Sequence, residues 1–203
     1  MQNSMKKTKK HLTVAVTGGI GSGKSFFIEV LKEKGFSTLS CDQIAKDLFE
    51  KRTIKKKLKK LFPSAVTGKI FLNVDRKKIS DIVFIDKDAL ARLNALTHPI
   101  IISETIKSAK KLKSPVFVEV PLLFEGNYTS LFDKTVVVVR DKNARIESVV
   151  SRSNLSYTEV VSRMNNQVDY DTIDLSEYIV INNDGSRESL ESNLYQILQK
   201  IYE

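Results

Sequence analysis

The sequence predicts an α/β protein with a five-stranded parallel sheet, and three observations support this fold class. Short, unbroken runs of β-branched and other apolar residues recur along the chain, which is typical of strands that are buried on both faces. Segments with apolar residues at helical spacing separate these runs, as crossover helices separate parallel strands. A glycine-rich segment, residues 18–25, joins the first apolar run to the first helical segment.

Five apolar segments are the predicted strands: residues 12–17, 36–40, 115–120, 135–140 and 178–182. The second and third of them lie about 75 residues apart, far more than one crossover connection requires. The residues between them are mostly at helical spacing. We therefore expect an inserted helical lobe over residues 42–113.

Two further helices, over residues 143–152 and 156–167, are predicted after the fourth strand, and they make up an expected helical lid at residues 143–170. Ser156 and Glu159 have the spacing of a capping box that opens the second helix. The last segment, residues 186–203, predicts an amphipathic closing helix. The expected core then comprises residues 11–41, 114–142 and 171–203.

The glycine-rich segment reads Gly18-Gly19-Ile20-Gly21-Ser22-Gly23-Lys24-Ser25 and fits the pattern of a phosphate-binding loop, or P-loop. Glycines let backbone N–H groups converge on phosphate oxygens, and the start of the following helix adds partial positive charge. We expect the loop from Gly19 to Ser25 to bind ATP, with Lys24 at the β- and γ-phosphates and Ser25 at Mg²⁺. A chance glycine-rich turn is the alternative, which the position between a strand and a helix disfavours. The motif and the sheet together predict the three-layer α/β/α fold of P-loop NTPases.

The composition is ordinary for a globular protein, with 203 residues of which 41% are hydrophobic and 28% are charged. No apolar run is long enough to cross a bilayer, and no signal-peptide stretch follows the first residues. The single cysteine, Cys41, excludes an internal disulfide and fits a reducing compartment. We expect a cytoplasmic protein with no membrane partner.

The formal net charge is +9, and lysines cluster at residues 6–10, 55–60 and 107–113. Such clusters are consistent with nucleic-acid binding, with attraction of small polyanionic substrates, or with a solvated helix face. For residues 55–60 we favour the solvated face, because Leu58 and Leu61 supply an apolar stripe that lysines flank. No nucleic-acid-binding motif accompanies the charge, so we expect no nucleic-acid partner.

A P-loop alone indicates binding of a nucleoside triphosphate, and the rest of the chain narrows the class of enzyme. The chain lacks the Asn-Lys-x-Asp segment of GTPases and is short for a motor or transport ATPase, whereas a small kinase fits its length and inserted lobe. Asp42 directly follows the second predicted strand, and ligands gather at the carboxyl ends of parallel strands. Asp42 is therefore a candidate base for an acceptor hydroxyl. As an alternative, Asp42 caps a helix that begins near Gln43.

Several segments, in their order and spacing, resemble the dephospho-CoA kinase family from about residue 12 to residue 190. Besides the P-loop they are Cys41–Ala45, Asp75–Ile79 with Val83 and Phe84, Leu93–Pro99, Pro121–Glu125, the lid residues Arg152, Arg163 and Gln167, and Ile181–Asn183. The chain departs from the pattern at Arg145 and Ser148, where many members carry glutamine and arginine, and at Phe26, which replaces a small residue.

The resemblance implies transfer of the γ-phosphoryl group of ATP to the ribose 3′-hydroxyl of dephospho-CoA, which gives coenzyme A and ADP. It implies ATP and dephospho-CoA as partners, Mg²⁺ as the cofactor, and residues 42–113 as the acceptor (CoA) lobe. A P-loop kinase for another nucleoside or small alcohol is the alternative within the same class. A nucleotide-dependent nucleic-acid binder is the alternative from another class. We expect a monomer with at most weak self-association.

The resemblance also implies roles for individual residues. Asp42 orients the 3′-hydroxyl and accepts its proton, while Lys24, Mg²⁺ and Arg152 neutralise the charge of the transition state. Arg152 and Asn182 join the P-loop in ATP binding, with Asn182 at the adenine side. The expected acceptor-binding residues are Asp42, His98, Leu122, Leu123, Phe124, Glu125 and Arg163.

Alternatives stay open for several of these residues. Arg163 belongs to the site, or it forms a surface ion pair with Glu159, four residues earlier on the same helix. His98 has a binding role or a purely structural one, next to Pro99, which we expect to mark a helix start.

The segment at 121–125 leaves two further questions open. The apolar side chains at 122–124 pack in the core or line the acceptor pocket. Glu125 supports the acceptor or the magnesium waters, and Glu119 is an alternative acidic partner for the metal shell.

Overall fold

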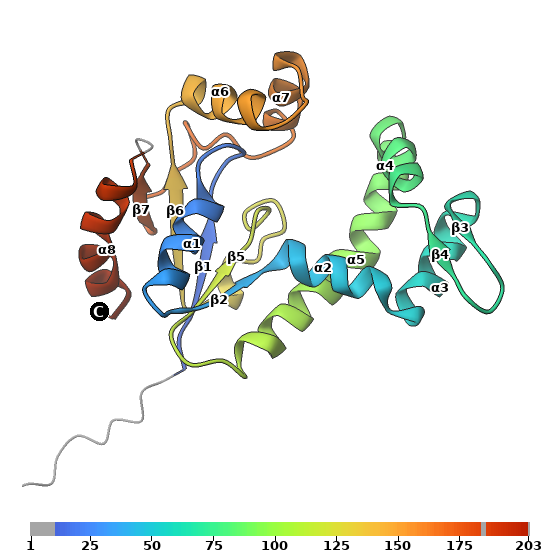
Figure 1. The fold of residues 1–203 in the computed structure, drawn as a ribbon, viewed down its shortest axis with the longest axis horizontal. Helices are drawn as coiled ribbons and strands as arrows, with labels where there is room; N and C mark the ends of the chain where they lie inside the picture. Colours follow the sequence, from blue (N-terminus) through green and yellow to red (C-terminus); the bar gives the residue numbers. More distant parts are fainter. Residues whose placement is uncertain (1–10, 184–185, 203) are drawn as a thin grey trace, which may run out of the picture. The chain divides into compact units, whose positions relative to one another are not determined.

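The structure is a computed structural model that describes residues 11–183 and 186–202 (Figure 1). It contains a five-stranded sheet in the order β2-β5-β1-β6-β7. The strands are β1 (Thr13–Thr17), β2 (Ser37–Ser40), β5 (Val116–Glu119), β6 (Lys134–Val139) and β7 (Ile179–Asn182). The predicted α/β fold class with a five-stranded parallel sheet is confirmed, and every strand begins and ends within one residue of its predicted bounds.

The centre of the sheet explains why the apolar runs lack alternation. β1 lies between β5 and β6 and pairs with both in parallel. Residues 14–16 of β1, 116–118 of β5 and 136–138 of β6 are fully buried. A strand that is covered on both faces has no side that favours polar residues. β1 therefore delivers the segment that follows it to the middle of the carboxyl edge of the sheet.

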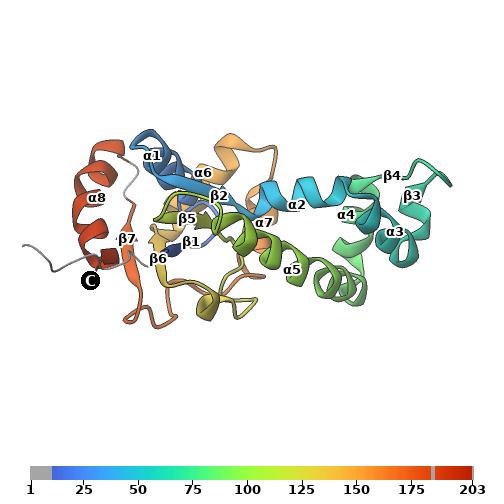
Figure 2. The same ribbon diagram turned by 90° about the horizontal axis from the view of Figure 1, so that it is seen from below.

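One face of the sheet is covered by α1 (Lys24–Glu33) and α8 (Arg187–Tyr202). Phe27 of α1 and Leu190 of α8 belong to the same buried cluster as alternate residues of β1 and β6. Figure 2 shows α8 beside β7, the strand at one edge of the sheet. α8 confirms the predicted closing helix as far as Tyr202, while residue 203 and the lysines at 6–10 lie outside the described residues.

α6 (Lys142–Arg152) and α7 (Tyr157–Met164) form the helical hairpin predicted after β6. Side chains of both helices share a small apolar cluster that includes Ile146 and Val160. The predicted capping box is present. Ser156 Oγ accepts the N–H of Glu159, and the Glu159 carboxylate accepts the N–H of Ser156 at 2.8 Å.

By its contacts the chain divides into two compact units, and residues 40–108 form the second. This unit holds α2 (Cys41–Glu50), α3 (Arg52–Leu61), a 3-10 turn (Pro63–Ala65), β3 (Val66–Thr67), β4 (Asn73–Val74), α4 (Arg76–Ile85) and most of α5 (Lys87–Ala109). It has a core of its own around Leu58, Phe62 and Ile79. The segment is mostly helical, as predicted. The hairpin of β3 and β4 was not predicted, because strands of two residues give no alternating pattern to detect.

α3 shows why lysines gather at residues 55–60. Ile54 and Leu58 are buried in the core of their unit, whereas Lys56, Lys57 and Lys60 are exposed. The cations therefore occupy the solvated face of an amphipathic helix, as predicted.

Pro99 does not mark a helix start, which corrects the sequence prediction. α5 runs from Lys87 to Ala109 with Pro99 in its interior. An interior proline removes one backbone hydrogen bond and strains the preceding turn. Leu96 and Ile100, on both sides of it, pack against the core of the unit, so tertiary packing overrides the local preference. Although α5 has 23 residues, neither it nor any other described helix is apolar enough to cross a membrane.

Candidate active site

The P-loop, residues 18–25, runs from the end of β1 into the first turn of α1. Gly21 and Gly23 have φ angles of 77° and 94°, in the left-handed region that favours glycine. A Cβ atom at Gly21 would collide with the carbonyl oxygen of Arg145, and one at Gly23 would collide with the side chain of Asn183. Only glycine fits at these two positions, so the loop keeps the tight turn that lets its amides converge on an anion.

Lys24 and Ser25 are the polar side chains with which α1 opens. The Lys24 ammonium donates hydrogen bonds to the carbonyl oxygens of Gly18 and Gly19, at 2.8 and 2.9 Å. These bonds hold the cation at the loop, where the motif requires it for phosphate binding.

Ser25 Oγ donates a hydrogen bond of 2.7 Å to Oε1 of Glu119, the last residue of β5. A hydroxyl and a carboxylate side by side at the P-loop suit Mg²⁺, which takes oxygen ligands and keeps several waters. Among residues 11–183 and 186–202 there is no cluster of three or more His, Cys, Asp or Glu side chains that would form a metal cage. The residues present fit a magnesium ion that divides its ligands between protein, water and phosphate.

A pocket of about 220 Å³ opens at the P-loop. It is lined by Gly21, Gly23, Lys24, Ser25, Phe26, Arg140, Ser148, Arg152 and Asn183. The structure therefore brings Arg152, the last residue of α6, to the P-loop. The pocket combines loop amides with one ammonium and two guanidinium groups, a setting that suits a polyphosphate.

The structure does not bring Asn182 into this pocket. Asn182 is exposed and lines a separate hollow, together with Asn193 and Lys200 of α8. Asn183 lines the P-loop pocket instead, and its Nδ2 donates to the carbonyl oxygen of Ser22 at 2.8 Å. Successive side chains of an extended segment point to opposite sides, so the neighbouring asparagines Asn182 and Asn183 line different hollows.

Two side chains from the segment after β6 support the P-loop. Gln167 Oε1 accepts the N–H of Ile20 at 2.8 Å. The Arg145 side chain is only 5% exposed and donates to both carboxylate oxygens of Asp171, at 3.0 and 2.8 Å. A Cβ atom at Gly19 would lie against the Arg145 guanidinium, so this cation packs under the loop. Gln167 belongs to the lid pattern of the family, whereas the sequence marked Arg145 only as a departure from that pattern.

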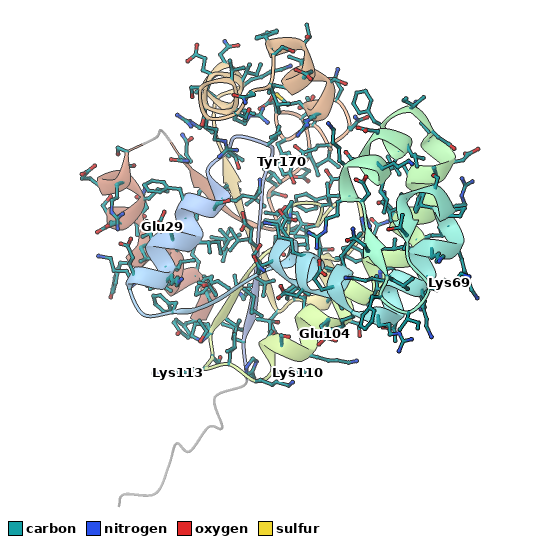
Figure 3. All side chains as sticks on the ribbon, turned by 45° about the vertical axis from the view of Figure 1, so that its right-hand side comes forward. Glu29, Lys69, Glu104, Lys110, Lys113 and Tyr170 are labelled. Carbon is teal, nitrogen blue, oxygen red and sulfur yellow. The ribbon has the colours of Figure 1, made fainter. Side chains whose placement is uncertain are left out.

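Tyr170, labelled in Figure 3, is a further residue that sequence reasoning missed. Its hydroxyl lies 3.3 Å from Thr17 Oγ1, at the end of β1. Burial raises the pKa of Tyr170 to about 12, and the nearby Glu125 carboxylate adds to this effect. The phenol is therefore protonated at neutral pH and serves as a fixed hydrogen-bonding group beside the loop.

The segment after β5 divides between the core and the surface. Leu123 is fully buried, so it packs in the core and cannot line a ligand pocket in this structure, which corrects its assignment to the acceptor site. Leu122 is 37% exposed. The Phe124 ring contacts the rings of Tyr170 and Tyr178, with centroids 5.8 and 5.2 Å apart.

Glu125 has one oxygen engaged and one free. Its Oε1 accepts the N–H of Val168 at 3.0 Å. Its Oε2 is buried and has no hydrogen-bond partner within the described part of the chain. A buried carboxylate oxygen without a partner is costly, which makes it a candidate acceptor for a bound group.

Asp42 is the second residue of α2, and Ser40 is the N-cap residue of that helix. The alternative that Asp42 caps a helix beginning near Gln43 is therefore wrong. Its side chain is exposed and forms no hydrogen bond or ion pair with any residue that the structure describes. A carboxylate in the first turn is compatible with the helix dipole without acting as a cap.

His98 lies in the interior of α5 and is half-buried. Burial lowers the pKa of His98, so the imidazole is neutral at pH 7. A neutral imidazole offers one donor and one acceptor, which suits hydrogen bonding to a ligand or to the protein.

Arg163 is exposed on α7 and does not line the P-loop pocket. The predicted surface ion pair with Glu159 is not among the ion pairs of the described residues, because the Glu159 carboxylate is taken up by the capping box. Hydrogen bonds from Ser156 lower the pKa of Glu159, and the charge of Arg163 contributes less.

A parallel sheet whose central strand leads through a P-loop into a helix defines the class of P-loop kinase-like proteins. The solved structure of a shikimate kinase from Bacteroides thetaiotaomicron has this fold, with a TM-score of 0.57 and 12% identity over 94% of this chain and 98% of that one. At this identity the likeness concerns the fold alone.

The comparisons by sequence identify the family. The sequence model of dephospho-CoA kinase matches residues 12–189, so the chain belongs to the dephospho-CoA kinase family. The dephospho-CoA kinase of Thermus thermophilus is 33% identical over 196 residues, which span 96% of this chain and 94% of that protein. That of Fusobacterium nucleatum is 31% identical over 192 residues, or 94% and 98% of the two proteins.

A solved structure agrees with this family. The dephospho-CoA kinase from Campylobacter jejuni aligns with a TM-score of 0.67 at 29% identity, over 94% of this chain and 96% of that one. The resemblance that the sequence motifs indicated is confirmed.

Proposed function

We propose that this chain transfers the γ-phosphoryl group of ATP to the ribose 3′-hydroxyl of dephospho-CoA, giving coenzyme A and ADP. The observation that carries this conclusion is family membership over residues 12–189. The cationic pocket at the P-loop supports it, because its charge suits a nucleoside triphosphate. ATP and dephospho-CoA are the partners, and the chain acts as a monomer in the cytoplasm.

Ser25, by its hydroxyl, and Glu119, by its carboxylate, are the residues that would hold the magnesium ion. When bound, Mg²⁺ neutralises charge on the β- and γ-phosphates. The hydrogen bond between Ser25 and Glu119 holds the two oxygen ligands beside each other, where such an ion would find both.

Lys24 and Arg152 supply the protein's own positive charge. Lys24 exchanges the carbonyl oxygens of Gly18 and Gly19 for phosphate oxygens, and Arg152 reaches the same pocket from the end of α6. Negative charge spreads over the migrating phosphoryl oxygens in the transition state, so fixed cations at this point stabilise it more than the ground state.

Asp42 orients the 3′-hydroxyl and accepts its proton. Its position directly after β2, its exposure and the lack of a competing partner among the described residues support this role. His98, Leu122, Phe124, Glu125 and Arg163 complete the proposed acceptor site. Neutral His98 and the free Oε2 of Glu125 offer hydrogen bonds there, while Leu123 contributes only by packing.

The direct test is turnover of dephospho-CoA by the purified protein with ATP and Mg²⁺. Formation of coenzyme A and ADP in equal amounts is expected. No turnover would contradict the proposal, and faster turnover of another nucleoside or small alcohol in a substrate panel would favour the alternative kinase. Salt-sensitive binding to generic DNA or RNA that persists at physiological salt would favour the nucleic-acid binder.

Replacing Asp42 by asparagine tests the proposed base. We expect Asp42→Asn to lower kcat by about 10²- to 10⁴-fold with little change in the Kd for ATP, because only the proton acceptor is lost. Asp47→Asn is the matched control, since Asp47 is exposed on the same helix and only accepts a hydrogen bond from Gln43. Equal kcat for Asp42→Asn and wild type would remove the assignment.

A further inference from the structure

Arg140 is the first residue after β6, and no sequence motif selects it. β6 pairs with β1, so Arg140 leaves the sheet at the carboxyl edge next to the strand that carries the P-loop. Its side chain lines the same pocket as Gly21, Lys24 and Ser25. Strand geometry therefore delivers a guanidinium to the proposed nucleotide site.

The hydrogen-bonding state of Arg140 is incomplete. The residue is half-buried, and its Nε is buried without a hydrogen-bond partner among residues 11–183 and 186–202. No carboxylate of those residues pairs with it. A buried N–H of a charged group is costly unless an acceptor meets it. The pocket therefore contains a guanidinium donor that lacks an acceptor.

The other polar side chains of the pocket do not provide that acceptor. The Arg140 Nε has no partner among them, and the Asn183 Nδ2 and the Ser25 hydroxyl are themselves donors, to the carbonyl oxygen of Ser22 and to Glu119. Ser148 and Arg152 lie four residues apart on one face of α6 and also line the pocket, and neither meets the Nε of Arg140. The natural acceptor is an anionic ligand in the pocket.

We propose that Arg140 is a nucleotide-binding residue that donates hydrogen bonds to the phosphate chain of ATP. It acts as a second guanidinium beside Arg152, but it comes from the sheet and not from α6. This inference rests on the proposed use of ATP by this pocket. The role of Arg140 is to hold the nucleotide, so its loss raises the Kd and KM for ATP more than it lowers kcat.

The experiment is calorimetric titration of wild type and Arg140→Met with ATP and with inorganic tripolyphosphate, each with Mg²⁺. Methionine keeps much of the apolar stem and removes the charged donor. We expect both ligands to bind about 10- to 100-fold more weakly to Arg140→Met, the usual effect of losing a charge-assisted hydrogen bond. Arg140→Lys is expected to lose less, because it keeps the charge. Equal melting temperatures check that the variants fold.

Lys142→Met is the matched control for net charge, since Lys142 is exposed two residues further on and does not line this pocket. Affinities of Arg140→Met within twofold of that control would overturn the proposal. So would a loss for ATP without a loss for tripolyphosphate, because Arg140 would then contact the base or ribose. The titration contains no dephospho-CoA, so it measures nucleotide binding alone. Failure to phosphorylate dephospho-CoA would therefore contradict the proposed function while leaving the test of Arg140 intact.

Discussion

Gln167 shows how single residues far from the P-loop in sequence decide the state of the loop. Its carboxamide oxygen accepts the N–H of Ile20, so one amide of the loop is held from outside. Asn183 holds the carbonyl oxygen of Ser22 in the same way. Both hydrogen bonds favour the loop conformation of this structure, and neither depends on a bound phosphate.

Replacing Gln167 by alanine tests this support. We expect the Kd for ATP to rise by about 2- to 10-fold, the equivalent of one neutral hydrogen bond, because the freed loop must be ordered on binding. Fluorescence titration with an ATP analogue measures the change. Asn166→Ala is the control, since Asn166 is the exposed neighbour. Indistinguishable affinities for the two variants would show that Gln167 does not support the loop.

The Arg145–Asp171 pair makes a prediction about stability. The Arg145 side chain is nearly inaccessible and Asp171 is about half exposed, so Asp171→Asn leaves a buried guanidinium without its counter-charge. We expect the free energy of unfolding to fall by about 3 kcal/mol, the lower end for a broken buried pair. Urea denaturation gives the value. Arg92→Gln breaks an exposed pair with Asp86 and should cost about 1 kcal/mol or less. Similar losses of unfolding free energy in the two variants would show that burial of Arg145 does not make its ion pair more important than an exposed one.

Whether a site residue could be predicted depends on how far it lies from the P-loop along the chain. Lys24 and Ser25 were predicted because the P-loop is a local pattern whose residues all lie within eight positions. Arg140 and Asn183 directly follow β6 and β7, which join β1 in one sheet, while Arg145 and Tyr170 contact the loop from the segment between those two strands. No local sequence pattern contains these contacts. Leu123 was misassigned because a buried and a pocket-lining leucine look alike in a sequence.

At the scale of elements, the turn between α6 and α7 shows a local signal that is sufficient. The capping box predicted from Ser156 and Glu159 is formed in both directions. Ser156→Ala removes the side-chain acceptor for the N–H of Glu159 and should destabilise α7 by about 1 kcal/mol. Faster hydrogen exchange of the α7 amides, by about fivefold, would report this. Ser162→Ala, at an exposed position within α7, should leave exchange unchanged, and equal exchange in the two variants would argue against the cap.

The strands were predictable from the sequence, whereas the course of α5 through Pro99 was not. The five strands were found because buried β-branched runs have few other uses. The prediction of a helix start at Pro99 was wrong. A proline is typical of a helix start, but α5 continues through Pro99 because its neighbouring residues pack against the core. A single sequence does not reveal elements that tertiary packing stabilises against the conformational preference of their own residues.

At the scale of the whole molecule, pH dependence tests the burial of His98. Its pKa in the folded state is lowered, so the unfolded chain binds more protons between that pKa and the ordinary value of 6.5. This contribution to stability is complete above pH 6.5 and is lost as the pH falls through the folded pKa.

The difference in unfolding free energy between wild type and His98→Gln, measured by urea denaturation from pH 8 to pH 5, isolates this effect. We expect the difference to change below pH 6.5, with wild type losing more stability on acidification than the variant. His11→Gln is the control at the only other histidine. Parallel pH curves for wild type and His98→Gln would contradict the burial of an uncharged imidazole.

The fold class and the family were predictable from the whole sequence because ordered motifs extend over most of its length. Helical spacing over the long insertion led to the predicted lobe at residues 42–113, and in the structure residues 40–108 form a compact unit with a core of its own. The roles of Asp42 and the acceptor residues remain predictions, because they depend on substrates as much as on the chain.

The α6–α7 hairpin contacts the P-loop near both of its ends. Arg145, near its first end, packs under Gly19, and Gln167, just beyond its second end, binds the backbone of Ile20. Arg152 extends from the same hairpin into the pocket. Because Arg145 and Gln167 fix the hairpin to the loop at both ends, the position of Arg152 depends on the conformation of the loop. A substitution that displaces the loop is therefore expected to displace Arg152 as well.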